Sequence, residues 1–184
     1  KRLSFELPRL WHTKAETLRE FAALDRNQSW KGTQSCWQQS RQSSVNGRRR
    51  QCGICAACML RRMSLHAAGL GDEDANTYVW KDLHAGTFKE GAARGFNGIT
   101  TAMREYAIAG VLHLEHLAGL LNSPAHQPAL QHNIGVTAEA LGLTASDCAS
   151  RIEKVLGQHS KEWREFLTGL GKESFIARWA GRQG

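Results

Sequence analysis

The sequence predicts a mainly α-helical fold, and three observations lead to that prediction. Apolar residues recur at three and four positions from Ile99 to Leu121, the spacing that places them on one face of a helix. Capping signals stand at Thr13 and Thr144, each followed three residues later by a carboxylate. Alternation of apolar and polar residues predicts one short strand, over Leu3–Leu7. We therefore expect helices to form most of the regular structure.

The first half is expected to contain two helices joined by a polar loop. Thr13 begins the first helix, with Glu16 completing a capping box. Its apolar positions are Leu18, Phe21, Ala22 and Leu24. Residues 27–51 are rich in Gln, Ser and Arg without apolar periodicity, which predicts an irregular loop. The second helix begins within a run of cysteines and ends at Gly69.

The second half is expected to be helical throughout. The long periodic segment ends before Pro124, because the residue preceding a proline disfavours helical geometry. A shorter helix is predicted over Pro128 to Leu143, and Thr144 with Asp147 begins another that extends through Leu167. The sequence Phe175-Ile176-Ala177-Arg178-Trp179 predicts a last short helix.

Composition narrows the class of protein. The chain has 184 residues, and 41% of them are hydrophobic, an ordinary value for a soluble globular protein. No apolar run approaches the roughly 20 residues that cross a bilayer, so we expect no membrane role. The chain begins at Lys1 without Met or a secretory signal, which suggests a fragment of a longer protein. Free thiols favour a cytoplasmic location.

The strongest chemical signal is a group of four cysteines. Cys52, Cys55 and Cys58 are separated by two residues each, and Cys36 precedes them by sixteen positions. Spacers of two residues turn successive sulfurs toward one ion, and a distant fourth ligand completes a tetrahedron. The pattern predicts a structural Zn²⁺ site that leaves no position open for catalysis. Cys148 lies apart in an apolar context and is expected to be an ordinary buried thiol.

Three alternatives to zinc remain open at this point: a disulfide framework, an iron–sulfur cluster and unligated core thiols. The odd total of five cysteines argues against a disulfide framework. Ferredoxin motifs begin with the same spacing but continue with Cys and Pro, whereas Met59-Leu60-Arg61 follows Cys58 here.

The net charge of +7 is partly concentrated around the cysteines. We name these arginines the arginine collar: Arg41, Arg48, Arg49, Arg50, Arg61 and Arg62. Such a collar is suited to phosphate contacts, and it leaves nucleotide, nucleic acid and acidic protein open as partners. The alternative is a solvated loop whose charges need no partner.

Four segments together resemble the C-terminal part of the 7-cyano-7-deazaguanine synthase (QueC) family, which makes queuosine precursors. Pro8 followed by Thr13-Lys14-Ala15-Glu16 resembles the family's Pro and Thr-Lys-x-Glu segment, and residues 33–37 resemble its Thr-x-Ser-Cys-aromatic segment. Residues 52–61 match its Cys-Gly-x-Cys-x-x-Cys-x-x-Arg pattern, and Ala68-Gly69 with Thr77-Tyr78 resembles the family's sequence after that pattern. The order and spacing of the four segments make the resemblance specific.

The resemblance implies a zinc held by Cys36, Cys52, Cys55 and Cys58 beside a Rossmann-like α/β PP-loop (adenine nucleotide alpha hydrolase-like) fold. It implies that residues 1–80 are the C-terminal part of a synthase-like domain and that residues 81–184 are a helical extension. Family members are ATP-dependent ligases that form C–N bonds. They adenylate the carboxylate of 7-carboxy-7-deazaguanine, let ammonia form the amide, and then dehydrate it to the nitrile.

Two departures from the family pattern shape the functional expectation. The family's Ser-Gly-Gly-x-Asp-Ser phosphate loop is not among these residues, so ATP with Mg²⁺ would bind through an N-terminal half outside them. The long basic loop and the extension resemble synthase-like proteins of antiviral defence operons (QatC-like). In such a protein the acceptor would be a protein amine, and the extra helices would bind a protein or operon partner. The rival class is a non-catalytic zinc module that binds either protein or nucleic acid. Of these two ligands, nucleic acid is not favoured.

Two residues are candidates for the substrate or nucleotide side of the site, and the catalytic residues are not identified. The resemblance implies that Lys14 faces the nucleotide, where it would neutralise a phosphate or carboxylate; the alternative is a surface lysine. Arg61 would bridge to substrate or satisfy nearby carbonyls. The spacing of His113 and His116 does not match a zinc-protease motif. Four tryptophans are expected to seal a small core: Trp11, Trp30, Trp37 and Trp80.

Overall fold

The computed structural model describes residues 6–24, 29–37, 44–71 and 76–181. Within them the protein is mainly helical, as the sequence predicted, and it also contains one small two-stranded sheet. Most of the strand predicted over Leu3–Leu7 lies outside the described residues, and Glu6 and Leu7 are not in a strand. No described helix is both long and apolar enough to cross a membrane.

The first helix, α1, spans Lys14–Leu24 and begins with the predicted capping box. Thr13 N donates to Glu16 Oε2 at 2.7 Å, and Glu16 N donates to Thr13 Oγ1 at 3.2 Å. The predicted apolar face was wrong for two of its positions, because Phe21 is 44% exposed and Leu24 is 81% exposed. Of the helix residues, Ala15 is the one that is buried.

The polar segment after α1 contains more regular structure than the sequence prediction allowed. A 3₁₀ turn, η1, spans Ser29–Gly32, and strands β1 (Ser44–Val45) and β2 (Arg48–Arg49) pair antiparallel. Asn46 and Gly47 join the strands with φ angles of 51° and 74°. Two successive positive φ angles define the tightest hairpin turns, which favour Asn-Gly. The prediction of an irregular loop overlooked this dipeptide.

Helix α2 spans Ala56–Ala68, ends at Gly69 in the left-handed conformation, and occupies the centre of the molecule. It packs against α1, against α3 (Thr101–Gly119) and against α5 (Ala145–Leu170). The approach of α3 is close: a Cβ added at Gly110 would lie 3.0 Å from Ala56 N and 2.6 Å from Met59 Cε. The helix that carries the cysteines is therefore clamped by residues from the second half of the chain.

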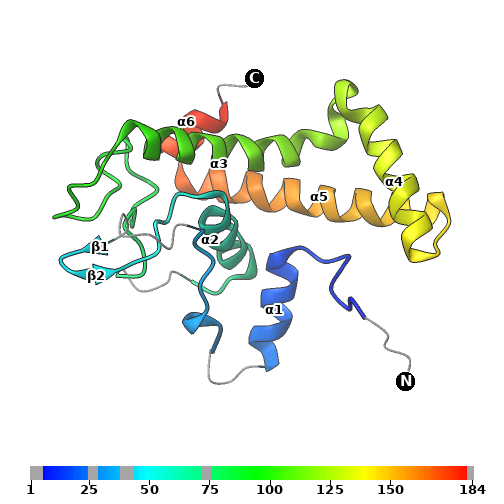
Figure 1. Ribbon diagram of the computed structural model, residues 1–184, viewed down its shortest axis with the longest axis horizontal. Coiled ribbons are helices and arrows are strands. Elements are labelled where there is room, and N and C mark those ends of the chain that lie inside the picture. Colours follow the sequence, from blue (N-terminus) through cyan, green and yellow to red (C-terminus); the bar gives the residue numbers. More distant parts are fainter. Residues whose placement is uncertain (1–5, 25–28, 38–43, 72–75, 182–184) are drawn as a thin grey trace.

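The remaining helices are α4 (Gln127–Leu141) and α6 (Phe175–Ala180), with 3₁₀ turns η3 (Leu120–Asn122) and η4 (Pro124–His126) between α3 and α4. Figure 1 shows α3 and α5 side by side, with α4 closing the far end. Thr144 caps α5 by accepting from Asp147 N at 3.1 Å, as predicted. The predicted helices of the second half are thus confirmed.

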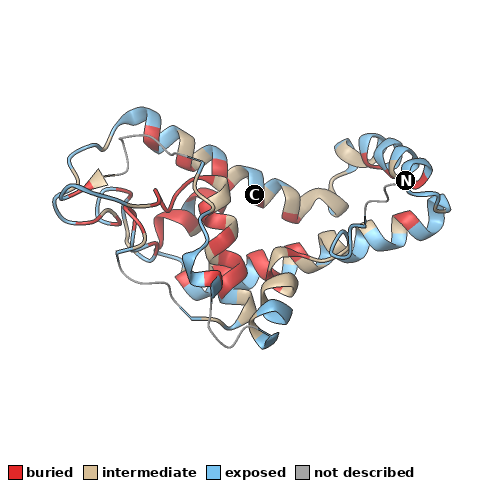
Figure 2. Cartoon of the chain, turned by 60° about the horizontal axis from the view of Figure 1, so that its bottom comes forward, coloured by how far each residue is buried: buried red, intermediate tan, exposed pale blue. Residues whose placement is uncertain are grey.

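Buried residues form one large cluster and one small one. The large cluster includes Val45, three of the four clustered cysteines, Trp80 and Trp163, so it contains residues from both sides of position 80. The small cluster joins α4 to α5 and contains Cys148, which is fully buried as expected. Figure 2 shows buried residues concentrated in the middle of the molecule and sparse toward the α4 end. The division at residue 80 and the PP-loop fold stay predictions.

Candidate metal centre and the adjoining cavity

Local structure brings the four cysteines to one point. Cys36 follows η1, Cys52 follows the β1–β2 hairpin, and Cys55 is the N-cap of α2, whose first turn contains Cys58. Gly53 bends the backbone between Cys52 and Cys55, with φ 84°. A Cβ at this position would lie 2.7 Å from the carbonyl oxygen of Trp80, so glycine is required on two counts.

The four sulfurs have the spacing and surroundings of a tetrahedral metal site. All four lie within 4.8 Å of one another, and Cys52 Sγ is 3.9 Å from Cys58 Sγ. Four thiolates on one zinc at about 2.3 Å would be separated by about 3.8 Å, so the cluster is close to that geometry. The backbone N–H groups of residues 52, 55 and 58 each donate to a cysteine sulfur, at 3.2, 3.3 and 3.3 Å. Sulfurs that accept hydrogen bonds favour the thiolate form.

The electrostatics of the cluster show why a cation suits it. Hydrogen bonding with the Cys52 side chain lowers the pKa of Cys36 to about 7, and hydrogen bonding with Cys36 lowers that of Cys55 below its usual range. The same contacts with Cys36 raise the pKa of Cys52 and of Cys58 above the usual range. The pKa values of neighbouring thiols are thus shifted in opposite directions, because each thiolate accepts hydrogen bonds that the adjacent thiols donate. A bound divalent cation removes this conflict, because it deprotonates every coordinating thiol.

Arg61 is buried and bonded to the protein. Its side chain is 2% exposed and donates to the Trp30 carbonyl at 3.0 Å and to Thr33 Oγ1 at 2.6 Å. These contacts tie α2 to η1, the segment that leads to Cys36. The sequence suggested two roles for Arg61, a bridge to substrate and the satisfaction of nearby carbonyls. The structure shows the hydrogen bond to a carbonyl, and the contact with substrate stays a prediction.

The arginine collar does not act as one surface among the described residues. Arg62 donates to the carbonyls of Trp80 and Lys81, both at 2.8 Å, and its guanidinium lies 4.8 Å from the Tyr78 ring centre. Arg48 and Arg49 are exposed on the hairpin, whereas Arg41 lies outside the described residues. Arg49, Arg50 and Lys31 instead line a polar cavity of about 430 Å³ that also reaches Cys36. The described arginines of the collar therefore include the buried Arg61, the partly buried Arg62 and a group on or near the hairpin, of which Arg49 and Arg50 line a cationic cavity.

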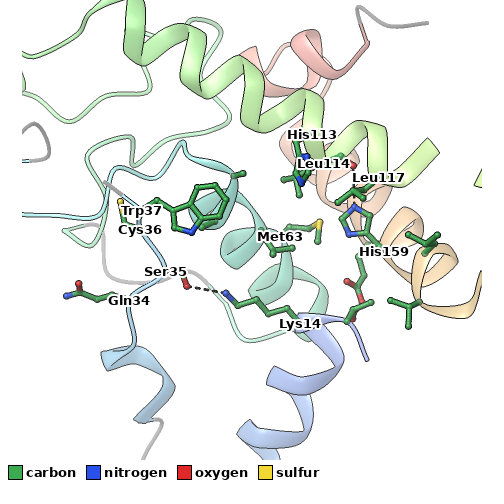
Figure 3. A pocket seen from close by; sticks show the side chains of 17 residues that line it. Lys14, Gln34, Ser35, Cys36, Trp37, Met63, His113, Leu114, Leu117 and His159 are labelled. Carbon is green, nitrogen blue, oxygen red and sulfur yellow. Dashed lines mark hydrogen bonds between the residues drawn. The ribbon is translucent and has the colours of Figure 1, made fainter. Parts of the chain in front are cut away.

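A second and larger cavity, of about 760 Å³, adjoins the sulfur cluster on another side. Lys14 lines it, and its Nζ donates to Ser35 Oγ at 3.1 Å (Figure 3). Its walls come from α1, α2, α3, α5 and the loop at residues 34–37. Cys36 and Trp37 belong to that loop, so one segment supplies both a candidate metal ligand and a cavity wall.

Sequence reasoning missed two polar residues of this cavity, His159 and Glu162, which are 9% and 1% exposed on α5. His159 Nε2 lies 3.2 Å from the carbonyl oxygen of Leu114. Neither residue belongs to a short sequence motif. The available signal was that Glu162 shares a helix face with the buried apolar residues of α5.

Of the other sequence candidates, His113 and Trp37 line the larger cavity. Glu115, which lies between His113 and His116 in the sequence, accepts from Trp163 Nε1 at 2.8 Å and from Arg164. The four sulfurs are the one group of three or more potential ligand residues found in the described part of the chain, so His113 and His116 belong to none. The tryptophan prediction was right for Trp30 and Trp80, which are buried, and wrong for Trp37, which is 67% exposed. The last of the four, Trp11, is partly buried beside Arg151.

One comparison with known proteins gives a match. Residues 1–69 match the QueC family. The family model is described as queuosine biosynthesis protein QueC, and its match covers α1, all four clustered cysteines and α2. The match confirms the resemblance indicated by the sequence motifs. Comparisons with curated proteins and with solved structures gave no match.

Proposed function

We propose that this chain is the zinc-containing part of an ATP-dependent, QueC-like synthase acting on 7-carboxy-7-deazaguanine. The observation that carries the proposal is a coincidence of position: the segment that matches the QueC family is the segment that gathers four cysteine sulfurs within 4.8 Å. A cavity large enough for a nucleobase adjoins that cluster, and Lys14 lines it. The family's chemistry and the position of the cavity both support a substrate site beside the four cysteines.

In this proposal the metal has a structural role. Zn²⁺ held by Cys36, Cys52, Cys55 and Cys58 would fasten the loop at residues 34–37 to the start of α2. That loop forms one wall of the cavity, so the ion would fix the wall without touching the reacting atoms. Arg61 supports the same arrangement by donating hydrogen bonds to the Trp30 carbonyl and to Thr33 Oγ1, which precede the loop.

The proposed reaction is acyl activation followed by amide formation. A carboxylate oxygen of the substrate attacks the α-phosphorus of ATP, and pyrophosphate leaves. An amine nitrogen then attacks the acyl carbon, and AMP leaves with the bonding pair. Lys14 is suited to hold the negative charge of the carboxylate at the polar end of the cavity, beside Ser35. ATP and Mg²⁺ would bind through a phosphate-loop half that is not among these residues.

The test uses the full-length gene product with any partner that co-purifies. We expect AMP release that depends on both ATP and 7-carboxy-7-deazaguanine, and a loss of at least tenfold in kcat/KM for Lys14→Met. The matched control is Lys161→Met, a change on an exposed face of α5. Substrate-independent AMP release, or none with a zinc-loaded and folded preparation, would contradict the proposal.

A protein amine as the acceptor is the second candidate, favoured by the contribution of α3 and α5 to the cavity walls. Both helices lie beyond the matched residues. Ammonia and a co-purifying polypeptide would be compared as acceptors, with mass spectrometry of each product. Efficient release of the free nitrile with ammonia would exclude the protein acceptor.

A further inference from the structure

Glu162 is a buried carboxylate with one unsatisfied oxygen. Its Oε1 accepts from Thr13 Oγ1 at 2.7 Å and from Gln158 Nε2 at 2.9 Å, whereas Oε2 has no hydrogen-bond partner among the described residues. The residue is 1% exposed. A buried carboxylate oxygen without a donor is costly, and such an oxygen is a reason to look for a ligand.

The unsatisfied carboxylate belongs to the wall of the cavity of about 760 Å³. The cavity has two chemically different ends. Figure 3 shows the Lys14 side chain extending toward Ser35, with Gln34 and Trp37 on the same side. His159, Leu117 and Leu114 gather on the other side (Figure 3). The site thus has a cationic, polar side at Lys14 and Ser35, and a side formed by α3 and α5 that combines apolar residues with two histidines and one carboxylate.

The charges of the lining indicate a neutral donor as the ligand for Glu162. Glu162 is the one carboxylate among the described lining residues, and Lys14 lines the same cavity. A cationic ligand would satisfy Glu162 but would face the Lys14 ammonium, whereas a neutral N–H group satisfies the carboxylate alone. Trp37, which is 67% exposed, is an aromatic residue of the same lining, on the side of Ser35 and Gln34 (Figure 3).

We propose that Glu162 Oε2 accepts a hydrogen bond from the N–H edge of a neutral planar heterocycle of the guanine type bound in this cavity. The choice of a guanine-type edge rests on the proposed function, whereas the preference for a neutral N–H donor rests on the opposite charges of Glu162 and Lys14 in the lining. Recognition by this residue would place a specificity determinant on α5, outside the residues that match the QueC family.

The test measures binding to the zinc-loaded chain by saturation-transfer NMR. The ligands are 7-deazaguanine and 7-deazapurine, which lacks both N–H donors of the pyrimidine edge. We expect 7-deazaguanine to bind at least tenfold more tightly, because a site built to accept a hydrogen bond rejects an analogue without the donor. Glu162→Gln should remove most of that preference. The matched control, Glu165→Gln, alters an exposed residue of the same helix and should leave it unchanged.

Several outcomes would overturn the proposal: equal affinity for the two ligands, tighter binding of n-butylammonium than of 7-deazaguanine, or an unchanged preference in Glu162→Gln. If that variant does not fold, Leu117→Trp fills the cavity from α3 and must abolish binding of 7-deazaguanine. A result that refutes the Glu162 contact can be distinguished from one that refutes the proposed synthase activity. Substrate-dependent AMP release by the full-length protein with no effect of Glu162→Gln on KM would refute this site alone.

Discussion

Gly53 holds a backbone conformation that other residues adopt with difficulty, at the point where the metal loop turns. Its φ of 84° and the 2.7 Å approach of the Trp80 carbonyl to an added Cβ both penalise a side chain. We expect Gly53→Ala to lower the free energy of unfolding by about 1–3 kcal/mol. Urea unfolding measures the loss, and zinc content should fall with it.

A second glycine provides the control for that change. Gly135 lies within α4, and an added Cβ there meets nothing within 4 Å. Gly135→Ala should therefore stabilise the protein by about 0.5–1 kcal/mol, the ordinary gain for a helix interior. A similar loss in both variants would show that the cysteine loop has no special need for glycine.

Arg61 is the buried cation of the site region, and its removal leaves acceptors without donors. Arg61→Met should cost about 2–3 kcal/mol of unfolding free energy, because the Trp30 carbonyl and Thr33 hydroxyl lose charged donors. Arg48→Met, on the exposed hairpin, should change stability by less than about 0.5 kcal/mol. Thermal unfolding of the two variants side by side separates structural from solvated arginines of the collar.

At the scale of elements, α5 depends on its first turn. Thr144 Oγ1 accepts from Asp147 N at 3.1 Å, and both residues are exposed, so the cap acts with little contribution from packing. Thr144→Ala should destabilise the protein by about 1 kcal/mol, and Thr144→Ser should restore most of it. Equal stability of all three proteins, measured by urea unfolding, would mean that the long helix is held by its packing alone.

The elements that the sequence predicted are those whose signals are local. The predicted helix boundaries agree with the structure at three places: the caps at Thr13 and Thr144 begin helices, and Gly69 ends α2. The hairpin was missed although Asn46-Gly47 is itself a local signal. The exposure of Phe21 and Leu24 was not predictable, because periodicity says which residues share a face and not whether another element covers it.

The candidate site likewise contains residues that have a local sequence signal and residues that have none. Spacing alone identified the four cysteines, since the turn at the start of α2 brings three of them together. Glu162 escaped notice because its partner Thr13 lies 149 positions away, and a contact of that range leaves no local pattern. The cavity likewise exists only after α3 and α5 pack against α2.

At the scale of the whole molecule, the metal should control stability. Three of the four cysteines belong to the large core cluster, and the fourth packs against it, so loss of zinc would expose the centre of the fold. We expect one equivalent of zinc per chain and a fall in Tm of at least ~10 °C when a strong chelator is added, because binding energy at such sites is folding energy. Zinc should also dissociate as the pH falls, because protons compete for the thiolates.

Cys58→Ser and Cys148→Ser separate the metal's effect from ordinary thiol packing. Both cysteines are fully buried, but Cys148 lies in the small cluster between α4 and α5. The first variant should lose zinc and the chelator response, and the second should keep both. Well under one equivalent of zinc in a normally folded wild-type protein, by elemental analysis, would refute the metal centre.

The position of Cys36 links the binding of zinc to the binding of a ligand in the larger cavity. The loop at residues 34–37 supplies one sulfur of the cluster and part of the wall of the larger cavity, and Cys36 also borders the smaller cationic cavity. A ligand that needs this wall in place favours the same loop conformation that the ion favours. By thermodynamic reciprocity, zinc would then tighten ligand binding by the factor by which the ligand tightens zinc binding. Changes in zinc supply would in that case alter the affinity of the cavity for its ligand.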